Sequence, residues 1–63
     1  MHITHAIKSI IEGKNLTEQE SYDAIDQIMS GQATDAQIAG LLIALRVKGE
    51  TVEEITGGAR ALA

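Results

Sequence analysis

Two histidines near the start of this 63-residue sequence are the first candidates for chemistry. His2 and His5 are spaced so that a helix would carry both imidazoles on one side, where they could share a metal ion. A closed zinc site needs further ligands, and the sequence contains no cysteine to supply them. We therefore interpret both histidines as solvent-facing side chains at the beginning of a helix, and we expect no metal site.

Three acidic residues and a pair of glycines resemble parts of catalytic or phosphate-binding sites, but each group is incomplete. Glu20, Asp23 and Asp26 follow the spacing of one helix face, with no histidine or lysine placed to form an acid–base pair. Gly57-Gly58 lacks the spaced glycines and the lysine of a P-loop, and indicates close helix packing or a hinge. We therefore expect no catalytic and no cofactor-binding residue in this sequence.

Charge and hydropathy narrow the classes of partner. A net charge of −4 disfavours nucleic acid and anionic membranes, because such surfaces are bound mainly through Lys and Arg. No apolar run is long enough to cross a bilayer, and the N-terminus lacks the order of a signal peptide. We expect a cytoplasmic protein that binds neither nucleic acid nor membrane. Arg46 and Lys48 suit the end of a helix, where they complement its dipole; contact with an acidic partner is the alternative.

The same helix-start signal recurs three times at intervals of 17 residues. Thr17, Thr34 and Thr51 each open a T-x-x-E/Q capping box, in which the threonine and the Glu or Gln satisfy each other's backbone N–H. Glycines, which readily end helices, lie shortly before the boxes at Gly13, Gly31 and Gly49. These signals predict helices over residues 2–12, 17–30 and 34–48, and a fourth from residue 51. The expected fold is all-α, a small four-helix, bundle-like domain with short connections, in which consecutive helices pack as hairpins.

Apolar residues at helical spacing predict the buried face of each helix. The first helix carries one stripe, formed by Ile3, Ala6, Ile7, Ile10 and Ile11. The second is lined on one side by Tyr22, Ile25, Ile28 and Met29. The residues of the fourth helix that are expected to face inward are Val52, Ile55, Ala59 and Leu62. Because the chain has no Phe or Trp, this core is thin, and the domain either owes much to regular helix geometry or buries surface against something else.

The third helix differs from the others because it is apolar nearly all round. One stripe consists of Ile38, Leu41, Leu42 and Leu45, and the second consists of Ala36, Gly40, Ile43 and Val47. A helix of this kind is buried on more than one side, and a chain this short has little to cover it. We interpret the second stripe as a subunit or domain interface, and expect a homodimer formed through this helix; packing among the four helices is the alternative.

Several short motifs in a fixed order carry a resemblance to a known family. They are L-T-x-x-E (Leu16–Glu20), I-M-x-G (Ile28–Gly31), Q-I-A-x-L-L-I-A-L-R-x-K-G-E-T (Gln37–Thr51), E-E-I-x-G (Glu53–Gly57) and A-x-A-L (Ala59–Leu62). In this order and spacing, the chain resembles the N-terminal helical domain of the anthranilate phosphoribosyltransferases. Pyrimidine-nucleoside phosphorylases begin with a similar domain, but the K-G-E-T turn looks more like the anthranilate enzymes.

The resemblance implies a function that the residues alone do not indicate. Enzymes of this family transfer phosphoribosyl from phosphoribosyl pyrophosphate to anthranilate in tryptophan biosynthesis, assisted by Mg²⁺, and commonly dimerise through the small domain. Residues 1–63 are then a single helical domain, the N-terminal fragment of a longer two-domain enzyme with a C-terminal α/β domain, and inactive alone. The helix that runs to Ala63 without a stop signal agrees with this expectation. A stand-alone helical interaction module and the phosphorylase domain are the alternatives.

Overall fold

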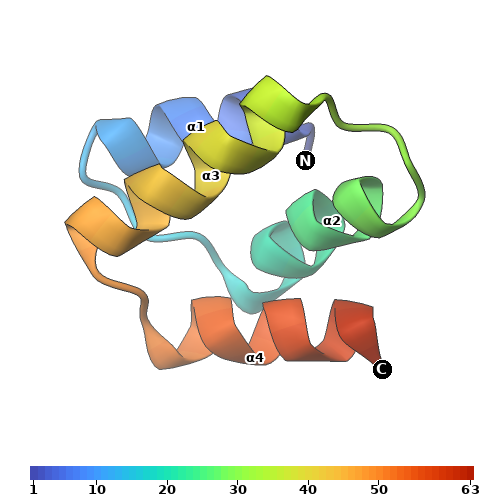
Figure 1. The fold of residues 1–63 in the computed structure, drawn as a ribbon. Helices are drawn as coiled ribbons and strands as arrows, with labels where there is room; N and C mark the ends of the chain where they lie inside the picture. The colour runs from blue at the N-terminus through green and yellow to red at the C-terminus, as the bar shows by residue number, and fades with distance from the viewer.

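Four α-helices joined by short links make up the computed structural model, which describes residues 1–63. They are α1 (Ile3–Ile11), α2 (Glu18–Met29), α3 (Asp35–Lys48) and α4 (Val52–Leu62), shown in Figure 1. The predicted all-α, four-helix fold is therefore confirmed, and each predicted helix is found within a few residues of its expected bounds.

Local capping signals fix where the helices begin and end. Thr17, Thr34 and Thr51 form complete capping boxes with Glu20, Gln37 and Glu54. Each of the three glycines ahead of these boxes has a positive φ, between 78° and 91°, a conformation that other residues rarely adopt. The first helix has a cap that was not predicted, since the Nδ1 atom of His2 accepts a hydrogen bond from the Thr4 N–H at 3.1 Å.

The helices pack as two crossed pairs rather than as consecutive hairpins. Helix α4 packs mainly along α2, and α3 packs mainly along α1, while the two pairs meet through α1 and α2 (Figure 1). The prediction that neighbouring helices form hairpins is therefore wrong. Short links limit the distance between helix ends, but the apolar faces decide which helices pack together, and those faces match alternate helices here.

The apolar core is small and lies between α1, α2 and α3. Its six buried side chains are Ile3, Ala6, Ile10, Leu16, Ala24 and Leu41. Helix α2 presents Ala24 and the hydroxyl of Ser21 to the interior, while Met29, which was expected to face inward, is 58% exposed. Ile25 and Ile28 of the predicted stripe do pack against the core, but the most buried residues of α2 are the small Ser21 and Ala24, so the buried face is rotated from the predicted one.

Helix α4 contributes no apolar side chain to this core. The stripe predicted to face inward is exposed, with Val52 at 75%, Ile55 at 61% and Leu62 at 63%, and Ala59 is exposed as well. The buried residues of α4 are instead Glu54 and Gly57. A Cβ atom at Gly57 would collide with the Glu18 carbonyl oxygen and lie 2.9 Å from the Tyr22 nitrogen, so the bare glycine backbone sets how α4 lies on α2. The interpretation of Gly57-Gly58 as a close helix contact is confirmed.

We expect the two adjacent glycines of α4 to respond in opposite directions to alanine. Gly57→Ala places a methyl group against the α2 backbone and should lower the free energy of unfolding by roughly 1–3 kcal/mol. Gly58→Ala, whose Cβ would lie 3.6 Å from Ile25, should leave stability unchanged or raise it by up to about 1 kcal/mol through helix propensity. Urea unfolding followed by circular dichroism measures both; equal effects would contradict the close contact at Gly57.

Candidate functional site

The four residues predicted to form an interface lie on the outer side of α3. Val47 is 83% exposed and Ile43 is 63% exposed, while Ala36 is also exposed and Gly40 is half-buried. An added Cβ at Gly40 would lie 3.6 Å from the Ile7 side chain, an ordinary contact, so the packing of α1 on α3 leaves room for a methyl group here. The structure brings Gly40, Ile43 and Val47 together along one groove; Ala36 does not line it.

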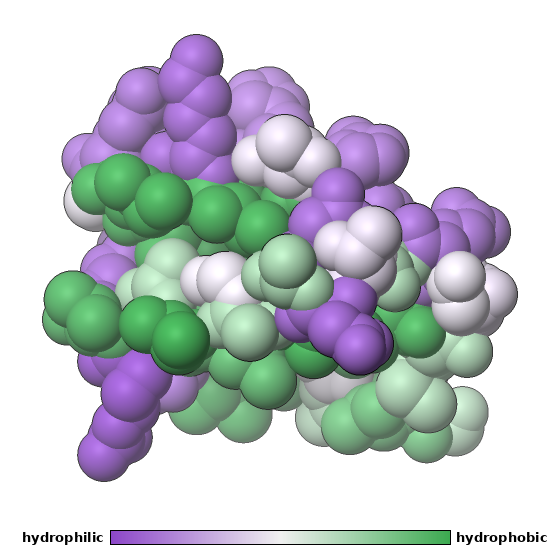
Figure 2. All heavy atoms as spheres, turned by 45° about the horizontal axis from the view of Figure 1, so that its top comes forward, coloured by the Kyte–Doolittle hydropathy of each residue, from purple (hydrophilic) through white to green (hydrophobic).

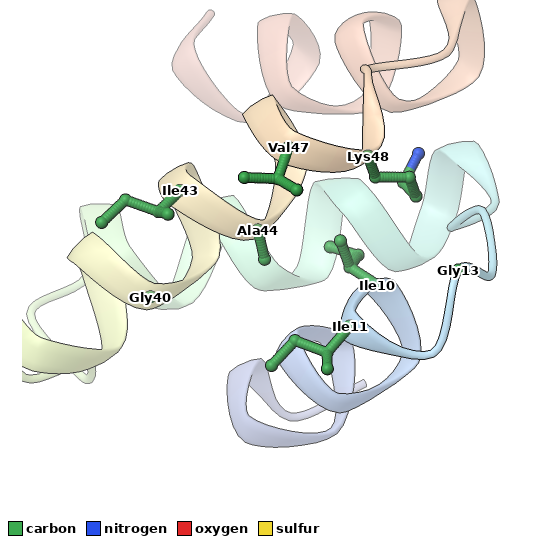
Figure 3. A pocket seen from close by; sticks show the side chains of 8 residues that line it. All are labelled: Ile10, Ile11, Gly13, Gly40, Ile43, Ala44, Val47 and Lys48. Carbon is green, nitrogen blue, oxygen red and sulfur yellow. The ribbon is translucent and has the colours of Figure 1, made fainter.

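This first groove runs between α1 and α3 and has a volume of about 410 Å³. Its lining residues are Ile10, Ile11, Gly13, Gly40, Ile43, Ala44, Val47 and Lys48 (Figure 3). Ile11 was expected to face the core, but it is 72% exposed and lies across the groove from α3. Hydrophobic side chains gather at the left of Figure 2, where the C-terminal ends of α1 and α3 lie. Large apolar side chains of α1 and α3 are thus exposed together along this groove.

A second groove lies between α3 and the α2–α4 pair, with a volume of about 340 Å³. Ile55, Ala59 and Leu62 of α4 line it together with Leu42 and Leu45 of α3. Leu42 is 53% exposed, so the first stripe of α3 is also left partly uncovered. The two apolar sides of α3 therefore face two different grooves, and the four helices of this chain cover neither of them fully.

A buried polar cluster sits at the junction between the two grooves. One carboxylate oxygen of Glu54 accepts hydrogen bonds from Lys48 Nζ at 2.8 Å and from the Thr51 N–H at 2.9 Å. The other oxygen accepts from the Leu16 N–H at 2.8 Å, and Glu54 is only 3% exposed. Lys48 also donates to the Asn15 side chain, so this pair joins the α1–α2 link to the α3–α4 link.

This cluster was not predicted from the sequence. Glu54 was interpreted only as the acidic member of a capping box, and Lys48 as a charge that complements the α3 dipole. The fold gives Lys48 a buried partner at 2.8 Å and leaves Arg46 exposed. The available signal was a lysine and a glutamate on either side of the short Gly49–Thr51 turn, but the third participant, the Leu16 N–H, is distant in sequence.

Hydrogen bonding decides the charge state of this cluster. Burial raises the pKa of Glu54, but hydrogen bonds from Lys48 and from the backbone N–H groups of Leu16 and Thr51 outweigh it. The pKa of Glu54 therefore lies below its usual value, and the carboxylate is ionised at neutral pH. The Ser21 hydroxyl donates to the Glu54 carbonyl at 2.6 Å, which ties the same residue to α2.

The other candidate groups have structural partners or face solvent. His5 and Asp26 are exposed, and Glu20 closes the capping box of α2. Asp23 accepts from the Met1 amine at 3.0 Å and from Gln19, and these bonds lower its pKa. Nowhere in residues 1–63 do three or more His, Asp or Glu side chains gather in a group that could hold a metal ion.

Comparison with known proteins identifies the family. A profile described as "Glycosyl transferase family, helical bundle domain" matches residues 4–63. The chain belongs to this family. Within it, the chain is 55% identical over 60 residues to the anthranilate phosphoribosyltransferase of Syntrophotalea carbinolica and 58% identical over 60 residues to that of Geobacter sulfurreducens. It is 56% identical over 57 residues to the enzyme of the same name from Acetivibrio thermocellus. The resemblance found in the sequence motifs is thereby confirmed.

The match covers nearly all of this glycosyl transferase helical bundle domain but little of each relative. The aligned regions span 90–95% of the chain and 16–17% of the length of these three relatives. No solved structure matches the chain. None of its helices has the length and apolarity needed to cross a membrane.

Acid should lower the free energy of unfolding of the chain. Protonation of Glu54 should account for a measurable share of this loss. The pKa values of Glu54 and Asp23 are lowered on folding, so the folded state binds fewer protons. Their stabilisation is fully present above about pH 5, weakens below the unfolded pKa of about 4.3 for Glu and 3.9 for Asp, and is lost as the pH falls through the folded values. Urea unfolding between pH 7 and pH 3 measures this loss.

The matched variants for this titration are Glu54→Gln and Glu53→Gln. Glu54→Gln should be less stable at pH 7 and should lose less stability on acidification than the parent. Glu53, the exposed neighbour, makes no comparable contacts, and its variant should follow the parent curve. A Glu54→Gln curve parallel to that of the parent would show that the buried carboxylate does not contribute to the acid sensitivity.

Proposed function

We propose that this chain is the N-terminal helical domain of an anthranilate phosphoribosyltransferase. The observation that carries the proposal is 53–58% identity over nearly the whole domain to proteins of that name. The activity is then transfer of phosphoribosyl from phosphoribosyl pyrophosphate to anthranilate, a step in tryptophan biosynthesis in the cytoplasm. The names of these relatives also favour this enzyme over a pyrimidine-nucleoside phosphorylase and over a stand-alone interaction module.

The residues that perform this reaction are proposed to lie outside residues 1–63. The described side chains include no candidate nucleophile, acid–base pair or phosphate loop, and the helix N-termini carry Glu18, Asp35 and Glu53 where a phosphate would bind. Mg²⁺ and both substrates are then bound mainly by a C-terminal α/β domain of the same polypeptide. The helical domain provides surfaces for assembly and one wall of an active-site cleft between the two domains.

The 63-residue chain alone should therefore not catalyse phosphoribosyl transfer. The measurement is the disappearance of anthranilate fluorescence in the presence of phosphoribosyl pyrophosphate and Mg²⁺. Adding a separately expressed remainder of the polypeptide to the chain is the matched comparison. Turnover by the 63-residue chain alone would place catalytic groups within it. It would refute the proposal that the residues that perform the reaction lie outside residues 1–63.

The first groove is proposed to bind a second copy of the chain. Ile11, Ile43 and Val47 are all more than 60% exposed around a floor formed by Gly40 and Ala44. Small residues flanked by branched apolar ones let two helices approach closely, and a two-fold axis would place each α3 in the groove of the other subunit. Burying three such side chains contributes roughly 1.5–3 kcal/mol each, which stabilises both the dimer and a thin core.

The second groove is proposed to pack against the remainder of the same polypeptide. The relatives are about six times longer than the matched domain, which supports the presence of such a remainder. Ile55 and Leu62 of α4 and Leu42 of α3 are exposed along one side of the molecule, away from Ile11 and Val47. Two separate apolar surfaces are expected of a domain that packs against two neighbours, here a second copy of the chain and the remainder of its own polypeptide.

Acidic substitutions in the first groove should weaken self-association more than folding. Val47→Asp and Gly40→Glu each place a charge where the partner helix would pack, and the dimer dissociation constant should rise at least roughly 100-fold. Val52→Asp is the control, because Val52 is 75% exposed but lines neither groove. Sedimentation velocity and circular dichroism separate assembly from folding. An unchanged oligomeric state in both groove variants would refute the proposed interface.

A further inference from the structure

Helix α4 is held to the other helices by a different kind of contact from the rest of the fold. The apolar core joins α1, α2, α3 and the Leu16 link, and contains no side chain of α4. Figure 1 shows α4 lying along α2 at the bottom of the molecule, on the side away from α1 and α3. Its central contact is the backbone of Gly57 against α2, and the α2–α4 pair is the most closely packed helix pair of the fold. Outside this backbone contact, polar groups attach α4 to the other helices.

Those polar groups lie at the two ends of α4. At the C-terminal end, Arg60 pairs with Glu18 at 2.7 Å and lies 4.9 Å from the centre of the Tyr22 ring, and both charged side chains are nearly half exposed. Exposed pairs of this kind contribute little. At the N-terminal end, the side chains of Glu54 and Lys48 are 1% and 10% exposed, and the two Glu54 oxygens together receive three hydrogen bonds. The N-terminal contact is the stronger of the two.

The Glu54 cluster connects the first turn of α4 to two other parts of the fold. It joins the start of α4 to the α1–α2 link through Leu16 and to the end of α3 through Lys48, whereas the bodies of α3 and α4 scarcely pack together. Every donor around the carboxylate is an N–H group. An amide at this position would turn one of its own N–H groups toward another donor, leaving a buried polar group without a partner.

We propose that α4 opens from the α1–α2–α3 core as a separate unit, and that the Glu54–Lys48 pair is the latch that keeps it closed. Opening breaks the Gly57 contact, the Arg60 pair and the Glu54 cluster, and keeps the contacts among the six core side chains, none of which belongs to α4. It removes one wall of the second groove, because Ile55, Ala59 and Leu62 move with α4. The opening is a property of the single chain and does not rest on self-association or on the proposed activity.

Native-state hydrogen exchange of the 63-residue chain, read residue by residue by NMR at low concentration, tests this proposal. In the parent chain, amides within α4 and the Leu16 amide should exchange at least roughly tenfold faster than the interior amides of α1. Glu54→Gln and Lys48→Met should each accelerate exchange in α4 at least roughly tenfold further, because either change weakens the closed state that α4 must leave; amides of α1 accelerate with them, since global unfolding includes the opening of α4. Glu53→Gln, one position away and exposed, is the control and should exchange like the parent.

Two results would overturn the latch. One is equal protection of α4 and α1 in the parent chain, which would make the four helices a single cooperative unit. The other is unchanged exchange of the α4 amides in both Glu54→Gln and Lys48→Met, which would show that this pair does not hold α4 closed. The comparison within the parent chain decides the first point even where a substituted chain does not fold.

Discussion

The contact between the Gly57 backbone and α2 is the constraint from which the rest of this structure follows. A helix that touches its neighbour through a glycine has its rotation about its own axis fixed, since only that side can approach so closely. Residues one turn away on the same side must then also face inward, and Glu54 is that residue. The apolar residues Val52, Ile55 and Leu62 are consequently turned outward, against the usual preference of a helix that packs on a core.

This arrangement accounts for both the small core and the two grooves. With α4 attached through backbone and polar groups, the six buried apolar side chains come from α1, α2, α3 and one link. The apolar residues that remain are spread over two open surfaces, on either side of α3. A chain of this size gains stability when such surfaces are covered, which agrees with its family membership and with the much greater length of its relatives.

Local features could be predicted from the sequence because their causes are local. A capping box needs only residues three apart, and a helix-ending glycine needs only its own φ, so all three caps and the four helices were expected correctly. Helix pairing and the rotation of α2 and α4 were not, because these depend on which small residue meets which backbone across the fold. Among the sites, the exposure of Ile43 and Val47 fits the predicted interface, whereas the Leu16 contact of Glu54 had no local signal.

The Lys48–Glu54 pair also connects the two surfaces, because Lys48 lines the first groove and Glu54 lines the second. The pair is already almost fully shielded from water, since the side chains of Lys48 and Glu54 are 10% and 1% exposed. Two charges 2.8 Å apart that already have their hydrogen bonds attract each other more strongly when water is excluded. The α3–α4 turn, with its buried ion pair, is therefore the place where a single change of charge alters the lining of both grooves.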